Sequence, residues 1–158
     1  MVRDAVILVV DDVADDAMMV LKAFDRASLG SKIFVLKDGE DAINYLSGEG
    51  QYKDRRLYPF PDIVLLDLKM PKVDGFEALK WIRSQPQFKD LVVVVLTLSS
   101  EIRDVNRAYQ LGANSFMVKP DEFSNVAAMA KLLKDYWRIG NRAPGQIQRP
   151  EGIQESKA

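Results

Sequence analysis

Several short apolar runs in this sequence end abruptly at a side chain that could do chemistry. The chain contains no cysteine and no histidine, which excludes thiol nucleophiles, disulfides, zinc fingers and histidine bases. Any chemistry must therefore come from carboxylates, hydroxyls and lysines. The polar residues that follow or end the apolar runs are Asp11, Asp12, Asp67, Thr97 and Lys119.

This set of side chains suits phosphoryl chemistry assisted by a divalent cation. Three carboxylates brought close together cannot all stay ionised without a cation, and hard oxygen donors of this charge suit Mg²⁺. A carboxylate held beside Mg²⁺ can attack a phosphoryl group in line and form an aspartyl phosphate. The hydroxyl of Thr97 and the ammonium of Lys119 could then contact the phosphoryl oxygens.

The elements that must position these residues alternate strictly along the chain. The apolar runs are short and β-branched, as in parallel strands buried on both faces, and the stretches between them have helical periodicity. The expected strands are residues 6–10, 33–36, 63–66, 91–96 and 115–118. The alternation predicts an α/β fold of the flavodoxin-like type, a doubly wound five-stranded parallel sheet of order 2-1-3-4-5 flanked by five helices. In this order the polar residues converge on one cleft at the carboxyl ends of the strands.

Length and composition indicate one domain without a nucleic-acid or membrane surface. The 158 residues suit a single domain, and 22 basic residues nearly balance 23 acidic ones, so neither a basic footprint nor a polybasic patch is expected. The first apolar run is too short for a signal or membrane segment, which favours a cytoplasmic location. We expect a domain over residues 1–137 and a disordered tail over residues 138–158. Residues 51–60 are interpreted as a long connection of a kind that often has a function.

Taken in order, these motifs resemble the CheY-like receiver domain of two-component response regulators. The resemblance covers about residues 5–137. It rests on Asp11-Asp12, on residues 64–71 with Asp74-Gly75, on Thr97, and on Lys119-Pro120.

The resemblance implies a role for each acid of the cluster. Asp67 would be the phosphoacceptor, and Asp12 and Asp67 would bind Mg²⁺ directly. Asp11 would act mostly through water, and Lys69 would offer its backbone carbonyl to the metal. The side chains of Lys69 and Ser99 would flank the path of the attacking water, where similar proteins vary the lifetime of the phosphate.

The resemblance also implies the residues that read the phosphoryl group. Thr97 and Lys119 would bind it, and Phe116, three residues before the lysine, would be the switch aromatic. This sequence departs from the usual pattern at Leu98, where receivers have a small residue. We expect the bulk of Leu98 to hinder water entry, to lengthen the phosphorylated lifetime and to restrict the swing of Phe116.

By this resemblance the chain is a single-domain response regulator rather than an enzyme. A sensor histidine kinase or histidine phosphotransfer protein would phosphorylate Asp67, and signalling would proceed through phosphorylation-dependent protein binding. The connection at residues 51–60 and the missing output domain resemble the subgroup that partners bacterial phytochromes. A homodimer through the fourth helix, fifth strand and fifth helix is plausible, with Val105 and Tyr109 as exposed apolar contacts.

Other functions fit the sequence less well. The chain could be a degenerate receiver that binds partners without phosphate. A Mg²⁺-dependent aspartyl-phosphate phosphohydrolase would want a second carboxylate two residues after the nucleophile, where Lys69 stands. Flavodoxin-like electron carriage conflicts with the acidic first loop, which repels phosphate unless a metal intervenes.

The site residues also have plainer interpretations. Asp11 and Asp12 could simply cap the following helix, and Asp67 could be a solvated loop acid. Thr97 needs no function at the end of a strand. Lys119 could be a solvated strand stop.

Overall fold

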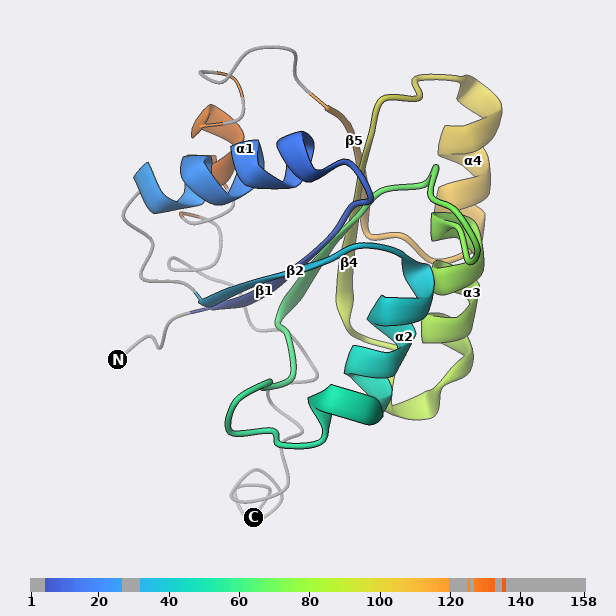
Figure 1. Cartoon of the computed structure of the whole chain (residues 1–158). Coiled ribbons are helices and arrows are strands. Elements are labelled where there is room, and N and C mark those ends of the chain that lie inside the picture. Colours follow the sequence, from blue (N-terminus) through green and yellow to red (C-terminus); the bar gives the residue numbers. More distant parts are fainter. Residues whose placement is uncertain (1–4, 27–31, 120–124, 126, 133–134, 136–158) are drawn as a thin grey trace, which may run out of the picture.

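The computed structural model describes residues 5–26, 32–119, 125, 127–132 and 135 of the chain (Figure 1). Its elements are β1 (Val6–Val10), α1 (Ala14–Arg26), β2 (Lys32–Leu36), α2 (Gly39–Ser47), the 3₁₀ turn η1 (Gly50–Tyr52), β3 (Ile63–Leu66), α3 (Gly75–Ser84), the 3₁₀ turn η2 (Pro86–Phe88), β4 (Val92–Thr97), α4 (Ile102–Gln110) and β5 (Ser115–Val118). The described residues from 125 to 135 are all helical. They belong to the fifth expected helix.

The strands form one parallel sheet in the order β2-β1-β3-β4-β5. In Figure 1, α1 and the helix after β5 lie on one face of this sheet, and α2, α3 and α4 cover the other. The doubly wound fold predicted from the sequence is therefore confirmed. Because every strand runs in the same direction, the carboxyl ends of β1, β3, β4 and β5 meet at one edge.

Two hydrophobic clusters fill the spaces between the sheet and its helices. Within β1, Leu8 and Val10 belong to the cluster that includes α2 and α3. Ile7 and Val9 belong to the cluster that includes α1. This division explains why the strand sequences are apolar throughout rather than alternating, since both faces of a central strand are buried.

The outer strands are more exposed to solvent than the sequence predicted, since the apolar runs indicated strands buried on both faces. All residues of β1 and β3 are buried, but β2 and β5 are only partly covered. Val35 is 44% exposed and Val118 is 48% exposed. Both strands lie at the edges of the sheet, where a neighbouring strand is present on one side alone.

The connection at residues 51–60 packs against α2. The hydroxyl of Tyr45 donates to the Pro59 carbonyl at 2.7 Å. The ring centroid of Tyr52 lies 5.0 Å from that of Tyr45 and 5.0 Å from that of Tyr58. These tilted and edge-on aromatic contacts anchor the connection to the core. Its expected function stays a prediction.

Some expectations lie outside the described residues. These are Pro120 of the Lys119-Pro120 motif, the end of the domain at residue 137, and the tail over residues 138–158. No helix in the described part of the chain is long and apolar enough to span a bilayer.

Candidate functional site

Backbone hydrogen bonds extend the sheet one residue past the ends of three strands. The Asp11 amide donates to the last carbonyl of β2 at 2.9 Å, and the Asp67 amide donates to the last carbonyl of β1 at 3.0 Å. The Lys119 amide donates to the Thr97 carbonyl at 2.7 Å. The backbones that carry the site residues are thus tied to neighbouring strands.

The loop after β3 turns tightly against Asp67. A Cβ on Gly75 would lie 2.1 Å from the Asp67 carbonyl oxygen and 2.6 Å from the Leu68 Cα, so this position requires glycine. The Leu68 amide donates to Asp67 Oδ1 at 2.8 Å. Asp74 then starts α3 through a capping box with Glu77. The tight turn holds the Asp67 backbone close to the start of α3, and the hydrogen bond from the Leu68 amide orients its carboxylate.

Three carboxylates come together at the carboxyl edge of the sheet. Asp11, Asp12 and Asp67 each offer an oxygen, and these oxygens all lie within 4.8 Å of one another. Asp11 and Asp67 are both 5% exposed, so the interpretation of Asp67 as a solvated loop acid is wrong, while Asp12 faces solvent. A set of carboxylate oxygens this close suits a hard divalent cation, which takes oxygen ligands.

Lys119 lies among these acids. Its Nζ is 2.7 Å from Asp11 Oδ2 and 3.2 Å from Asp67 Oδ2, and its side chain is only 8% exposed. A fourth acid, Asp16, contacts the same Nζ at 2.8 Å. Lys119 is therefore not a solvated strand stop. It pairs with two buried carboxylates and one partly exposed carboxylate.

Burial and ion pairing shift the pKa values of this cluster in opposite ways. Burial raises the pKa of Asp11, against the lowering effect of the hydrogen bonds from Lys119 and from the Val13 amide. Burial alone would lower the pKa of Lys119, but the hydrogen bonds to Asp11 and Asp16 and the charge of Asp67 raise it above its ordinary value. Asp11 Oδ1 accepts from the Val13 amide at 2.9 Å, just before α1. Asp11 thus contacts both the start of the helix and the lysine.

Thr97, the last residue of β4, has a buried hydroxyl at the carboxyl edge of the sheet. It is fully buried, and its Oγ1 has no hydrogen-bond partner within the described part of the chain. An unpaired buried hydroxyl is costly, so this atom suits a polar group that arrives from outside. The next residue, Leu98, is 66% exposed. Phe116 is half-buried against the α3 side of the core.

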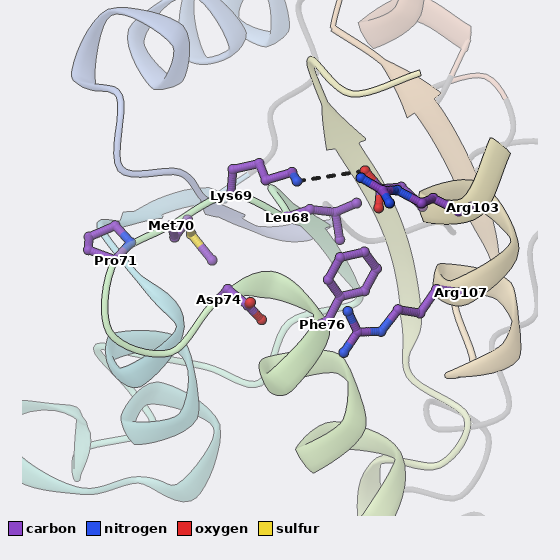
Figure 2. A pocket seen from close by; sticks show the side chains of 9 residues that line it. Leu68, Lys69, Met70, Pro71, Asp74, Phe76, Arg103 and Arg107 are labelled. Atoms are coloured by element: carbon purple, nitrogen blue, oxygen red, sulfur yellow. Dashed lines mark ion pairs between the residues drawn. The ribbon is translucent and has the colours of Figure 1, made fainter. Parts of the chain in front are cut away.

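Lys69 and Ser99 both contact Asp104 of α4. Ser99 Oγ donates to Asp104 Oδ2 at 2.5 Å, and Lys69 Nζ lies 3.7 Å from the same oxygen. The hydrogen bond from Ser99 holds the pKa of Asp104 below its usual value. Figure 2 shows the Lys69 side chain reaching across a pocket of about 610 Å³ toward α4, with Arg103 and Arg107 on its far wall. The ammonium of Lys69 is thus directed toward α4.

The sequence interpretation missed Asp16 and Asp104. Asp16 lies in the first turn of α1, where an acid is ordinarily explained by the helix dipole. The available signal was a second acidic pair, Asp15-Asp16, one turn beyond Asp12. Asp104 is buried on the same helix face as Ala108, four residues later. An acid on an apolar helix stripe was the signal there.

Comparison with known proteins gives one family and several relatives of similar length. Residues 7–131 match the response regulator receiver domain. The chain is 38% identical over 143 residues to the probable methanogenesis regulatory protein FilR2 of Methanothrix harundinacea, covering 89% of this chain and 88% of that protein. It is 33% identical over 132 residues to response regulator Rcp1 of a Synechocystis species, covering 84% and 88%.

Solved structures agree with the sequence relatives. The phosphorylated cyanobacterial phytochrome response regulator RcpA superposes with a TM-score of 0.82 at 30% identity, over 90% of this chain and 99% of that one. The Mn²⁺-bound form of Rcp1 superposes with a TM-score of 0.78 at 31% identity, over 89% and 99%.

Proposed function

The chain belongs to the response regulator receiver family, and we propose that it signals by accepting a phosphoryl group on Asp67. The phosphoryl donor would be a phosphohistidine of a sensor histidine kinase or of a histidine phosphotransfer protein. One observation carries the assignment: Lys119 Nζ contacts Asp67 Oδ2 at 3.2 Å inside a buried group of acids at the strand ends. A charged group placed there can stabilise the negative charge that a phosphoryl group brings.

Asp11, Asp12 and Asp67 would hold Mg²⁺, with the backbone carbonyl of Lys69 as a further ligand. The proximity of the three carboxylate oxygens supports this donor set, and Asp11 would contribute mainly through water. When bound, the cation supplies positive charge that offsets the phosphoryl oxygens. The Mn²⁺-bound form of the relative Rcp1 is consistent with a divalent cation in this family.

The reaction itself is a transfer between two side chains. A carboxylate oxygen of Asp67 forms the new bond to phosphorus as the bond from phosphorus to the donor imidazole nitrogen breaks. Lys119 pairs with a phosphoryl oxygen. The hydroxyl of Thr97 donates to another and gains the partner that it lacks within the described residues. Thr97 and Phe116 move toward the phosphoryl group, and Phe116 acts as the switch.

The readout would be a change in partner affinity. Movement of Thr97 and Phe116 would alter the surface made by α4, β5 and the last helix. Tyr109 is 47% exposed there, as expected, whereas Val105 is only partly exposed; Val118 is 48% exposed. This surface could bind a downstream protein or a second copy of the chain. A difference of a few kcal/mol in the free energy of partner binding between the two conformations is sufficient for such a switch.

The phytochrome link extends the proposal to the source of the signal. RcpA is described as a phytochrome response regulator, and another similar structure, 31% identical with a TM-score of 0.82, is a regulator in red light signalling of R. palustris. We propose that a phytochrome-like sensor kinase, in the cytoplasm, phosphorylates this chain.

Labelling with radioactive acetyl phosphate and Mg²⁺ tests the phosphoacceptor. The wild type should take up label that hydroxylamine releases, and Asp67→Asn should take up none while its circular dichroism is unchanged. Asp15→Asn, which removes an exposed acid near the site, should label like the wild type. Label that persists on Asp67→Asn would refute the assignment, and an unlabelled wild type would favour the degenerate receiver.

A further inference from the structure

Asp16 contacts the site lysine but is not part of the group of acids that could hold a metal. We propose that Asp16 is a positioning residue, which keeps the Lys119 ammonium beside Asp67 when a divalent cation binds Asp11, Asp12 and Asp67. This inference rests on the proposed function of the site. It adds a residue whose role is to retain the lysine rather than to touch the cation or the phosphoryl group.

The ammonium of Lys119 has as many donors as it has carboxylate partners. Its three N–H groups face Asp11 Oδ2 at 2.7 Å, Asp16 Oδ2 at 2.8 Å and Asp67 Oδ2 at 3.2 Å. Two of these acids belong to the group with oxygens within 4.8 Å of one another, and Asp16 does not. The lysine and a bound cation would therefore compete for two carboxylates and not for the third.

Competition of this kind has a large energetic cost when no other partner is present. A divalent cation bound to Asp67, and to Asp11 through water, repels an ammonium that contacts the same two side chains. Lys119 is only 8% exposed, so an ammonium pushed off both acids would be buried without a counter-charge. Asp16 removes this desolvation penalty because its ion pair with Lys119, at 2.8 Å, does not involve a carboxylate that the cation would bind.

The position of Asp16 is fixed by the packing of α1. The next residue, Ala17, and Val20, one turn further along, are both buried in the core cluster on this face of the sheet. The side chain of Asp16 is 31% exposed. Asp16 therefore stands on a helix that is packed against the core, at the rim of the site, partly exposed to solvent and in contact with Lys119.

Calorimetric titration of the unphosphorylated protein with Mg²⁺ tests this role through a double-mutant cycle. We expect Asp16→Asn to weaken Mg²⁺ binding in the parent, and to weaken it roughly threefold less in a Lys119→Met background, where no lysine has to be kept. Asp15→Asn removes the same charge from the neighbouring residue, and its effect should be equal in both backgrounds. Asp16→Glu keeps the carboxylate and should restore most of the lost affinity.

Side-chain nitrogen resonances of ¹⁵N-lysine-labelled protein give a readout that a purely structural role would not move. With saturating Mg²⁺, the Lys119 ammonium should stay protected from solvent exchange in the parent and in Asp15→Asn. It should lose this protection in Asp16→Asn. Protection that is unchanged in Asp16→Asn, or equal effects of Asp16→Asn in both backgrounds of the cycle, would overturn the proposal.

The outcomes also separate this inference from the function on which it rests. If the wild type binds no Mg²⁺, the proposed metal site fails and the role of Asp16 fails with it. If Mg²⁺ binds and the cycle shows no coupling, the role of Asp16 alone is wrong. If coupling is found but Asp67 takes no label, the lysine is held as proposed in a site that is not phosphorylated.

Discussion

Replacing Lys119 by methionine should reveal how much of the fold depends on the charge at the centre of the site. Methionine keeps most of the length and apolar volume of the lysine stem and removes only the ammonium. Asp11 and Asp67, each 5% exposed, then remain buried without their nearest positive charge. We expect Lys119→Met to destabilise the protein in the absence of Mg²⁺.

The size of the loss follows from the burial of the partners. Removing one partner of a buried ion pair costs about 3–5 kcal/mol, because the charge left behind stays buried. Asp16, the third partner, is 31% exposed and regains water more easily, so we expect a value near the lower end, about 3 kcal/mol. Lys131→Met is the control, since Lys131 pairs with Asp135 on the surface, with 70% of its side chain exposed. That change should cost less than about 0.5 kcal/mol.

Urea denaturation at several pH values provides the assay. The raised pKa of Asp11 should rise further without Lys119, so the folded variant binds a proton at a higher pH than the unfolded chain does. Its stability should therefore increase as the pH falls through that pKa, while Lys119 of the wild type stays protonated throughout. The difference between wild type and variant should be largest near neutral pH and shrink in mild acid.

Mg²⁺ should reverse much of the effect. A ligand at ten times its Kd adds about 1.4 kcal/mol of stability, and the variant should bind the cation more tightly because no ammonium competes with it for Asp11 and Asp67. A loss below about 1 kcal/mol at neutral pH, or a loss that does not change with pH, would refute the view that Lys119 neutralises buried acids.

Three further predictions address other parts of the structure. Leu98→Ala should shorten the phosphorylated lifetime in a dephosphorylation time course; an unchanged rate would rule out steric gating of water. Gly75→Ala should cost about 1–3 kcal/mol in urea denaturation and slow labelling of Asp67, because its Cβ would lie 2.1 Å from the Asp67 carbonyl oxygen. Arg83→Met removes three hydrogen bonds that join α3 to η2 and to the loop before β5, each of 2.9 Å. This change should lower the free energy of unfolding by about 2 kcal/mol and leave the labelling of Asp67 intact. A loss of labelling in the folded variant would contradict a purely structural role for Arg83.

The fold and the meeting of the site residues could be predicted from the sequence because they depend on local patterns. Apolar runs that end at Asp11, Asp67 and Lys119 mark strands and their carboxyl ends, and parallel order then brings these ends together. This prediction needs only the strand order and no knowledge of how side chains from distant elements are directed. The same reasoning identified the edge of the sheet where the cluster lies.

The residues that it missed depend on side-chain directions across the fold. Asp16 is 103 positions from Lys119 along the chain, and the acidic pair Asp15-Asp16 in a first helical turn is equally well explained by the helix dipole. Asp104 contacts Lys69 only because α4 packs beside the loop after β3. Partial exposure of Val35 likewise follows from strand order rather than from its own residue type.

The hydrogen bonds that continue the sheet past the strand ends have a consequence for how the protein moves. The amides of Asp11, Asp67 and Lys119 each donate to a neighbouring strand, so they should exchange with deuterium as slowly as amides in the middle of β1 and β3. Slow exchange there, beside faster exchange at Leu98, would mean that the main chain under the reacting groups keeps still while side chains and the loop after β4 relocate. Phosphorylation would then be transmitted by changes in side-chain rotamers and in the loop after β4, while the backbone of the sheet stays in place.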